Sequence, residues 1–237
     1  METRYQHDKI VHNLKDPKII IKEVLKHFSP KTAIDLWCWL GTFVKVLQDN
    51  WVDAYWVNWD RIEKDKLFID EKNLIIKNLE EFYDFWKKYD LAISLEVAEH
   101  IDEKYSDNFV KTLISCSDYI IFSAATSWQW WQNHVNEQRP EYREKKFNKY
   151  WYKFYDVFRH IFWDDKNIFW RYKQNMFLVA KEWKEIPKTL VEKWPKYVIH
   201  PELFEGIDIR KWTTKQLVKE SIYRIYMNTF GKFIKIC

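Results

Sequence analysis

The chain of 237 residues carries 39 basic and 35 acidic side chains, so its formal charge is only +4. This excess is spread along the chain without a basic block, which argues against a nucleic-acid partner. No apolar run approaches the roughly 20 residues of a membrane span, and the N-terminus lacks the apolar core of a secretory signal. The three cysteines, Cys38, Cys116 and Cys237, have no metal-type spacing, so we expect a reduced, cytoplasmic protein without a metal site.

The glycine and tryptophan content is abnormal. Globular proteins contain about 7% glycine, whereas this chain has 3 glycines and 15 tryptophans. Many tryptophans fall at expected turns or strand ends, where glycine is usual. UGA encodes Trp in one variant code and Gly in another, so we predict that glycine codons are written here as Trp; the alternative is a genuinely Trp-rich protein. The predicted glycines are Trp37, Trp39, Trp51, Trp56, Trp59, Trp128, Trp130, Trp131 and Trp151, whereas Trp86, Trp183, Trp194 and Trp212 stay unassigned.

Hydrophobic periodicity predicts short strands that alternate with helices. Strands are expected over residues 32–36, 53–57, 73–76, 91–95 and 119–124, and a late one, which could be antiparallel, over 169–180. Helices are expected over 18–28, 41–50, 103–114 and 141–150, and from the third strand through Trp86. This alternation indicates an α/β fold with a parallel sheet that is covered by helices on both faces.

The organisation changes near both ends of the chain. We expect an N-terminal helical segment over residues 1–30, a core domain over 31–182 and a helical extension over 183–237. Prolines interrupt the extension before an amphipathic stretch at 213–233, which predicts a helix packed on the domain. A helix that binds a membrane or a partner is the alternative. A long polar loop at 125–140 follows the fifth strand, and loops of this length are usually functional or disordered.

The first strand runs into the segment D-L-W-C-W-L-G, which begins at Asp35 and ends at Gly41. With glycine at 37 and 39 it becomes a glycine-rich turn that lets a nucleotide-like cofactor approach the helix N-terminus. With Trp at both positions, two indoles would block the crevice beyond the strand ends. Asn58 ends the second strand, where an acidic residue would bind ribose hydroxyls; a polar turn explains Asn58 equally well.

The segment S-L-E-V-A-E-H, which ends at His100, follows the fourth strand. Together with the glycine-rich turn, it resembles the class I S-adenosylmethionine-dependent methyltransferases over about residues 30–182. The resemblance implies a Rossmann-like α/β fold whose mostly parallel sheet has seven strands. The resemblance implies S-adenosylmethionine as cofactor: the turn would line its methionine part, Asn58 and Trp59 its ribose, Asn78 and Leu79 its adenine, and Glu96 its sulfonium. The implied cofactor-binding residues are Asp35, Trp37, Cys38, Trp39, Gly41, Asn58, Trp59, Asn78, Leu79 and Glu96.

Residues 122–142, with glycine at 128, 130 and 131, resemble a signature of a bacterial methyltransferase subgroup often linked to glycan and surface-polysaccharide genes. The motif contains His134, Asn136 and Glu137, which we place on the acceptor side. His134 could be a general base oriented by Glu137, with His100 as an alternative base, although each could instead be structural. Arg159, Trp163, Trp170 and the pair Gln174-Asn175 agree with the same subgroup, which makes Trp163 and Trp170 true tryptophans.

The resemblance therefore implies methyl transfer to a small-molecule or glycan-linked acceptor at oxygen. An N-methyltransferase acting on an amino sugar is the enzymatic alternative. A catalytically silent binding module is the alternative if Trp37 and Trp39 are literal, because the crevice is then blocked. A nucleic-acid methyltransferase is disfavoured by the absence of a basic patch and of an N/D-P-P-Y/F motif. The sequence does not specify the oligomeric state.

Overall fold

The computed structural model describes residues 13–59, 62, 64–129, 133–192, 198–203 and 214. The chain divides into two compact units, residues 1–200 and 201–237. The predicted helix at 213–233, except residue 214, lies outside the described residues, as do Trp130, Trp131, Trp194, Trp212 and Cys237. The predicted domain boundaries after residues 30 and 182 stay predictions. Within the described segments, no helix has both the length and the apolar character that a membrane crossing requires.

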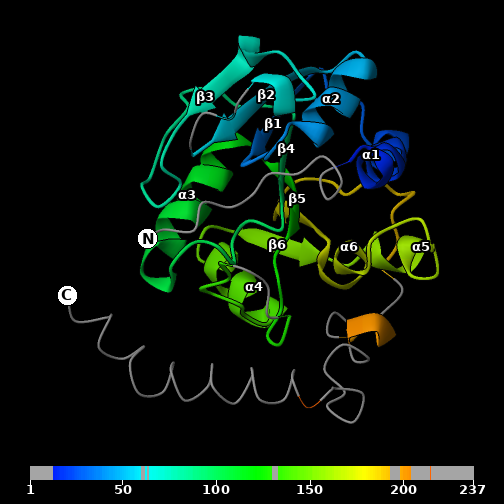
Figure 1. Ribbon diagram of the computed structural model, residues 1–237. Coiled ribbons are helices and arrows are strands. Elements are labelled where there is room, and N and C mark those ends of the chain that lie inside the picture. The colour runs from blue at the N-terminus through cyan, green and yellow to red at the C-terminus, as the bar shows by residue number, and fades with distance from the viewer. Residues whose placement is uncertain are drawn as a thin grey trace. The chain divides into compact units, whose positions relative to one another are not determined.

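A seven-stranded sheet in the order β3-β2-β1-β4-β5-β7-β6 forms the centre of the first unit (Figure 1). Strands β1 to β5 are parallel, and β7 runs antiparallel to both of its neighbours. The predicted mostly parallel, seven-stranded α/β sheet is therefore confirmed. The strands are β1 Thr32–Leu36, β2 Asp53–Asn58, β3 Leu74–Ile76, β4 Leu91–Leu95, β5 Tyr119–Ser123, β6 Tyr152–Tyr155 and β7 Phe177–Lys181.

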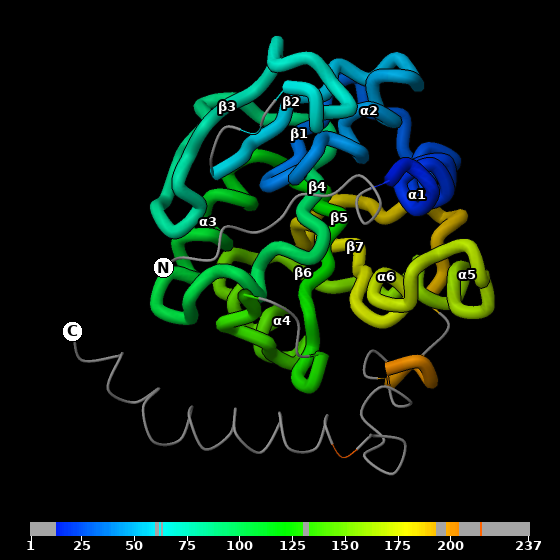
Figure 2. Tube along the Cα trace, in the orientation of Figure 1, coloured from blue at the N-terminus to red at the C-terminus, as the bar shows by residue number. Residues whose placement is uncertain are grey.

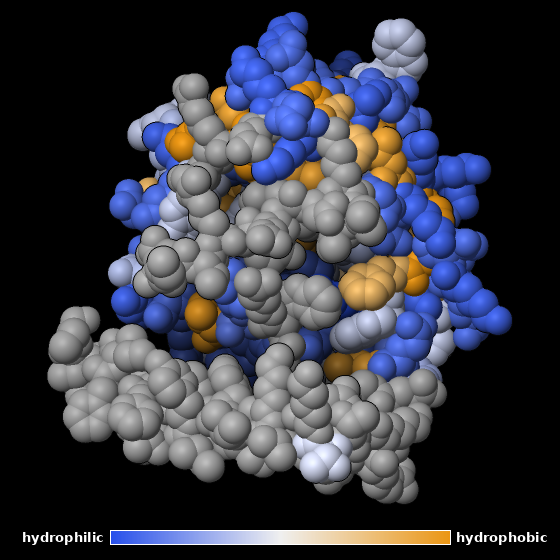
Figure 3. All heavy atoms as spheres, viewed as in Figure 1, coloured by the Kyte–Doolittle hydropathy of each residue, from blue (hydrophilic) through white to orange (hydrophobic). Residues whose placement is uncertain are grey.

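Helices cover both faces of this sheet (Figure 2). Because side chains alternate along a strand, Ala33 of β1 packs in the core beneath α1 and α2, whereas Ile34 and Leu36 pack in the core beneath α3 and α4. Over the side chains coloured in Figure 3, hydrophilic residues dominate and apolar ones show between them. The helices are α1 Lys15–His27, α2 Thr42–Asp49, α3 Ser106–Cys116, α4 Pro140–Asn148, α5 Arg159–Phe162 and α6 Trp170–Asn175, with short 3-10 turns at Lys64–Lys66, Glu71–Asn73 and Glu103–Tyr105.

Local sequence explains where α1 begins and ends. Pro17 lies in its first turn, where a missing N–H does no harm. Ile20, Ile21 and Val24 form its buried face. The helix ends at His27, and Phe28 is already extended two residues before Pro30, a residue type that disfavours continued helix. The prediction of a helix over 18–28 is thus confirmed, with an earlier start.

The predicted helix from the third strand through Trp86 is wrong. Side chains in this segment hold the backbone amides that a helix would need: Asn78 Oδ1 accepts from the N–H of Glu80, and Thr112 Oγ1 accepts from the N–H of Tyr83. Trp86 itself has a left-handed backbone with φ 52°. Hydrogen bonds between side chains and backbone compete with helix formation, and in this segment they replace the hydrogen bonds of a helix.

The first half of the predicted late strand at 169–180 is also wrong, because it forms α6. Asp16 Oδ1 on α1 accepts the N–H of Phe169 at 2.9 Å, at the position that precedes α6. The second half forms β7, antiparallel as anticipated. The edge strand β6 has no counterpart among the located strands of the sequence prediction; it has only four residues.

The arginine of a buried ion pair in the segment after β6 also contacts α6. Arg159 and Asp156 are 0% and 1% exposed, and the guanidinium donates from both Nε and Nη2 to the carboxylate. Arg159 Nη1 also donates to the backbone oxygen of Gln174 at 2.8 Å. A planar guanidinium suits such divided contacts. Arg159 and Gln174, which the sequence motif singled out, therefore hold the two segments together.

Candidate functional site

The candidate site lies beyond the carboxyl ends of β1, β2, β4 and β5. The chain leaves β1 toward β2 on one side of the sheet and later returns to place β4 on the other side of β1. Such a reversal of strand order opens a crevice at the carboxyl edge, where open α/β sheets bind their ligands. The segments that carry the predicted site residues all follow strands that end at this edge.

The turn after β1 has a left-handed backbone at every second residue. The φ angles are 71° at Trp37, 54° at Trp39 and 81° at Gly41. The N–H of Trp37 donates to Val57 of β2 at 2.8 Å, so the turn stays joined to the sheet. Side chains with a Cβ are strained in this region of conformation. A Cβ at Gly41 would also meet the side chain of Ile69, so the turn has little room.

Indole rings fill the space beyond the end of β1. The ring centroids of Trp37 and Trp39 are 4.9 Å apart and stacked, and Trp59 lies 5.6 Å from Trp37. His100 meets both rings of the turn edge-on, at 5.4 and 5.5 Å. In the sequence as printed, tryptophans therefore occupy the crevice beyond the end of β1.

The residues expected at the ribose and adenine lie in varied surroundings. Asn58 is buried, and its Nδ2 donates to the backbone oxygen of Trp39 at 3.0 Å, so it supports the turn directly. Asn78 is half-buried and caps its own loop. Leu79 and Cys38 are 1% and 3% exposed and pack in the two halves of the core.

Glu96 follows β4 with a strained backbone, at φ 57°. Its N–H donates to the backbone oxygen of Ser123 at 3.1 Å and lies 2.9 Å from the hydroxyl of the same residue. Its Oε1 accepts from Nδ2 of Asn175 at 3.1 Å, and Asn175 also donates to Oε1 of Gln129 at 3.0 Å. Such strain often marks a functional position. The sequence motif included Asn175 but gave no sign that it would contact Glu96.

The structure brings His134 and Glu137 together. Nδ1 of His134 donates to Oε1 of Glu137 at 2.6 Å, and the two side chains are 3% and 12% exposed. The second carboxylate oxygen of Glu137 accepts the N–H of Gln129 at 3.1 Å. Because Nδ1 carries the proton, Nε2 of His134 has the lone pair that a base needs. The two side chains are therefore in contact, and their roles as base and orienting residue stay a prediction.

Glu99 and His100 lie next to this pair. Nε2 of His134 is 3.8 Å from Oε1 of Glu99, and the His100 and His134 ring centroids are 4.9 Å apart. Burial raises the pKa of Glu99 well above its usual value, and the nearby Glu96 raises it further. Burial, together with His134, lowers the pKa of His100 to about 4. Sequence reasoning noted Glu99 only as a letter of a motif, because its complete burial depends on distant segments.

The loop after β5 is fastened to the turn after β4. The backbone oxygen of Glu99 accepts from the N–H groups of both Val135 and Asn136 at 2.9 Å. The amide side chain of Asn136 donates to the backbone oxygen of Ile101, and Arg143 donates to the backbone oxygen of Asn136. Asn136 therefore fixes the loop that presents His134.

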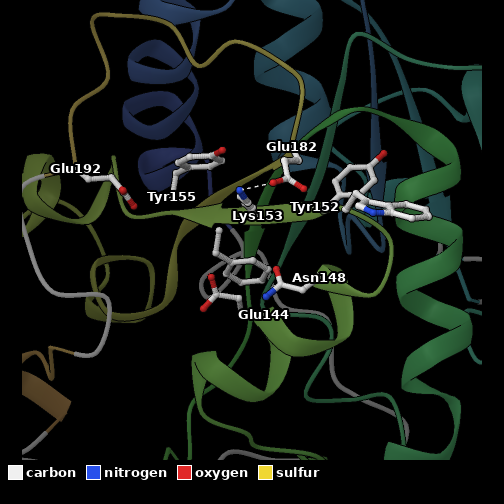
Figure 4. Close-up of a pocket in the computed structure, with 9 residues that line it drawn as sticks. Glu144, Asn148, Tyr152, Lys153, Tyr155, Glu182 and Glu192 are labelled. Carbon is white, nitrogen blue, oxygen red and sulfur yellow. Dashed lines mark ion pairs between the residues drawn. The ribbon is translucent and has the colours of Figure 1, made fainter.

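A separate cavity of about 380 Å³ lies at the edge strand β6 (Figure 4). Residues of α4, β6 and the segments near Glu182 and Glu192 surround it, and Lys153 pairs with Glu182 at 2.6 Å. None of the predicted site residues lines this cavity, which belongs to a different edge of the sheet from the crevice.

No protein-family model matches the chain, and no curated protein matches it either. A search of solved structures finds a S-adenosylmethionine-dependent methyltransferase from Archaeoglobus fulgidus, 14% identical, with a TM-score of 0.51 over 71% of this chain and 94% of that one. A S-adenosylmethionine-dependent methyltransferase from Clostridium acetobutylicum is 12% identical, with a TM-score of 0.51 over 73% and 95%. The small RNA methyltransferase HEN1 is 15% identical, with a TM-score of 0.50 over 83% of this chain and 29% of that one.

The chain has the class I methyltransferase fold. At these identities the comparisons establish the fold alone. The solved structures named above are methyltransferases, and the acceptor of this chain is not determined by them.

Asp35 predicts a pH dependence of stability. Its side chain is 3% exposed on β1, and burial raises its pKa to about 8 from 3.8. Between these values the folded chain retains a proton that the unfolded chain has lost. Its contribution to the free energy of unfolding should therefore fall as pH rises from 4 to 8, by at most about 1.4 kcal/mol per pH unit. Urea unfolding of the parent and of Asp35→Asn across this range should show a flatter profile for the variant; parallel profiles would contradict the raised pKa.

Proposed function

We propose that the chain is a cytoplasmic S-adenosylmethionine-dependent methyltransferase that methylates an oxygen of a small-molecule or glycan-linked acceptor. The observation that carries the proposal is a single crevice edge that holds three features at once. These are the left-handed turn after β1, the strained Glu96 after β4, and the His134–Glu137 pair on the loop after β5. The fold of the chain supplies the expected cofactor class.

The cofactor side of the crevice would be formed by the turn and by Glu96. A turn without side chains lets the backbone approach the ligand at the start of α2, where the helix N-terminus attracts negative charge. Glu96 is held by Asn175 through one oxygen, and its other oxygen is buried without a hydrogen bond. A carboxylate in this position suits the positive charge of the sulfonium.

The acceptor side would be formed by His134 and Glu137. In the proposed reaction the acceptor hydroxyl oxygen attacks the methyl carbon, the bond between that carbon and sulfur breaks, and S-adenosylhomocysteine leaves. The hydroxyl proton passes to Nε2 of His134, and Glu137 stabilises the imidazolium through Nδ1. His100 would be the alternative base. Positioning supplies a large part of the rate in such displacements.

We also propose that several tryptophans of the printed sequence are glycines in the natural protein. Eight described residues other than glycine have a positive φ, and six of them are tryptophans: Trp37, Trp39, Trp51, Trp86, Trp128 and Trp151. Five belong to the predicted set, and Trp86 joins them. Trp56 is different, because it lies in β2 and is fully buried; there the support is that its indole N–H has no hydrogen-bond partner.

A catalytically silent binding module is the second candidate. It is favoured by one observation, the stacked indoles of Trp37 and Trp39 in the crevice. An N-methyltransferase acting on an amino sugar would use the same crevice and differs only in its acceptor. We propose that the acceptor is not a nucleic acid, because the chain has a formal charge of only +4 without a basic block.

The recoding proposal predicts the composition of native protein. Peptide mass spectrometry on material from the natural host should find glycine at positions 37, 39, 51, 56, 59, 86, 128, 130, 131 and 151, and tryptophan at 163 and 170. The physical reason is the left-handed backbone at most of the first group, which costs a bulky residue about 1–2 kcal/mol each. Tryptophan at both 37 and 39 in native material would contradict the proposal.

Cofactor binding should depend on the turn. The version with glycine at 37, 39 and 59 should bind S-adenosylmethionine and S-adenosylhomocysteine, whereas the printed sequence should bind neither, because indoles occupy the crevice. Titration calorimetry on the two versions measures this. A version with glycine only at 51 and 151, two exposed positions outside the crevice, is the matched control and should not gain binding. Equal affinity of all versions would refute the crevice assignment.

Substitution on the acceptor side should separate turnover from cofactor binding. In the glycine version, His134→Ala or Glu137→Ala should lower single-turnover methyl transfer by ~10²-fold or more if the pair moves the proton. Affinity for S-adenosylmethionine should stay within a few-fold. His27→Ala is the control, because His27 also pairs with a glutamate, Glu23 at 3.1 Å, but far from the crevice. Loss of cofactor binding in a folded variant would place the pair on the wrong side.

A further inference from the structure

We propose that Glu99, His100 and His134 bind a divalent transition-metal ion. Each of the three side chains offers one ligand atom, and these atoms all lie within 4.8 Å of one another. The sequence does not predict a metal site here, because this cluster lacks the cysteines by which metal sites are commonly recognised in a sequence. The three ligands come from the turn after β4 and the loop after β5, which the backbone of Glu99 ties together.

Both histidines are oriented as metal ligands usually are. Nδ1 of His134 donates to Glu137 at 2.6 Å, and Nδ1 of His100 donates to the backbone oxygen of Asn133 at 3.1 Å. In each ring the proton therefore sits on Nδ1, so that Nε2 carries the electron pair. A carboxylate or carbonyl that accepts the other ring proton is the common support of a metal-bound histidine, because it fixes both tautomer and orientation.

The carboxylate of Glu99 supplies the second, independent observation. Its side chain is fully buried, and neither oxygen has a well-formed hydrogen bond, although its own amide and that of Ala125 lie near. The cation Arg143 lies close enough to act on this charge, but its guanidinium donates to the backbone oxygen of Asn136. A buried carboxylate whose oxygens lack well-formed hydrogen bonds is costly. A cation bound between Glu99 and the two imidazoles would remove that cost.

The donor set selects the kind of ion. Two imidazole nitrogens with one carboxylate suit Zn²⁺, Mn²⁺ or Fe²⁺, whereas Mg²⁺ and Ca²⁺ prefer oxygen ligands throughout. Ligand atoms held about 2.1 Å from one ion stand roughly 3–4 Å apart. The observed spread therefore closes with side-chain movements of about an ångström.

The ion would change how the acceptor is activated, and this step rests on the proposed methyl transfer. Nε2 of His134 cannot hold an ion and accept a proton at the same time. With the ion bound, an acceptor hydroxyl that coordinates it would lose its proton to water. The reason is that a divalent cation lowers the pKa of a hydroxyl group coordinated to it. The resulting alkoxide would attack the methyl carbon. Glu137 would then orient His134, whose Nε2 coordinates the ion.

Metal binding can be tested without any acceptor. The purified chain, stripped with a chelator, is titrated with Zn²⁺, Mn²⁺ and Mg²⁺ by calorimetry, and metal content is measured after dialysis. One Zn²⁺ or Mn²⁺ per chain should bind, and Mg²⁺ at least tenfold more weakly. Glu99→Gln, His100→Ala and His134→Ala should each weaken Zn²⁺ binding by tenfold or more. Glu137→Gln should weaken it by about tenfold, because it only orients a ligand.

His27→Ala is the matched control and should bind as the parent does, since it removes a histidine paired with a glutamate elsewhere. Circular dichroism establishes that each variant is folded, and His100→Ala, at a half-buried position, keeps the test decisive if the other two unfold. No stoichiometric ion in the folded parent, or equal affinity in His100→Ala and His27→Ala, would overturn the proposal. Stoichiometric binding without methyl transfer in the glycine version would support the ion and count against the proposed function alone.

Discussion

The crevice depends on one constraint, the sharp turn by which the chain leaves β1. Three residues within five have a left-handed backbone, yet the N–H of Trp37 still reaches the backbone oxygen of Val57 on β2. Asn58 holds the same turn from the end of β2. Glycine is the residue that takes this conformation without strain. The identity of residues 37 and 39 therefore decides whether the edge of the sheet is an open binding crevice or a packed cluster of indoles.

Backbone hydrogen bonds also join the segments that follow β4 and β5, on the other side of this turn. The backbone of Glu96, after β4, is bonded to Ser123 of β5, and the backbone oxygen of Glu99 holds the loop that follows β5. The polar cluster is thus assembled from two chain segments that backbone hydrogen bonds fix to each other. Preorganisation of this kind reduces the cost of bringing reacting groups together.

The sequence predicts most of the sheet because its strands are short apolar runs bounded by polar turns, and the five strands over residues 32–124 are found within a residue or two. It fails where side chains decide the backbone, as in the segment after β3, and where a distant residue caps an element, as Asp16 does before α6. In the candidate site, the resemblance points to His134 and Glu137, whose side chains the structure brings into contact. The sequence does not predict the buried environment of Glu99, because that environment is made by segments far apart in the chain.

The two hydrogen bonds from Val135 and Asn136 to the backbone oxygen of Glu99 also bear on how an acceptor would enter the crevice. A bulky substrate that displaced the loop would break both bonds and pull His134 away from Glu99 in the same movement. Such a displacement would separate the residues that act on the acceptor in the proposed reaction. In the proposed reaction, acceptors that reach His134 without displacing the loop would therefore react fastest.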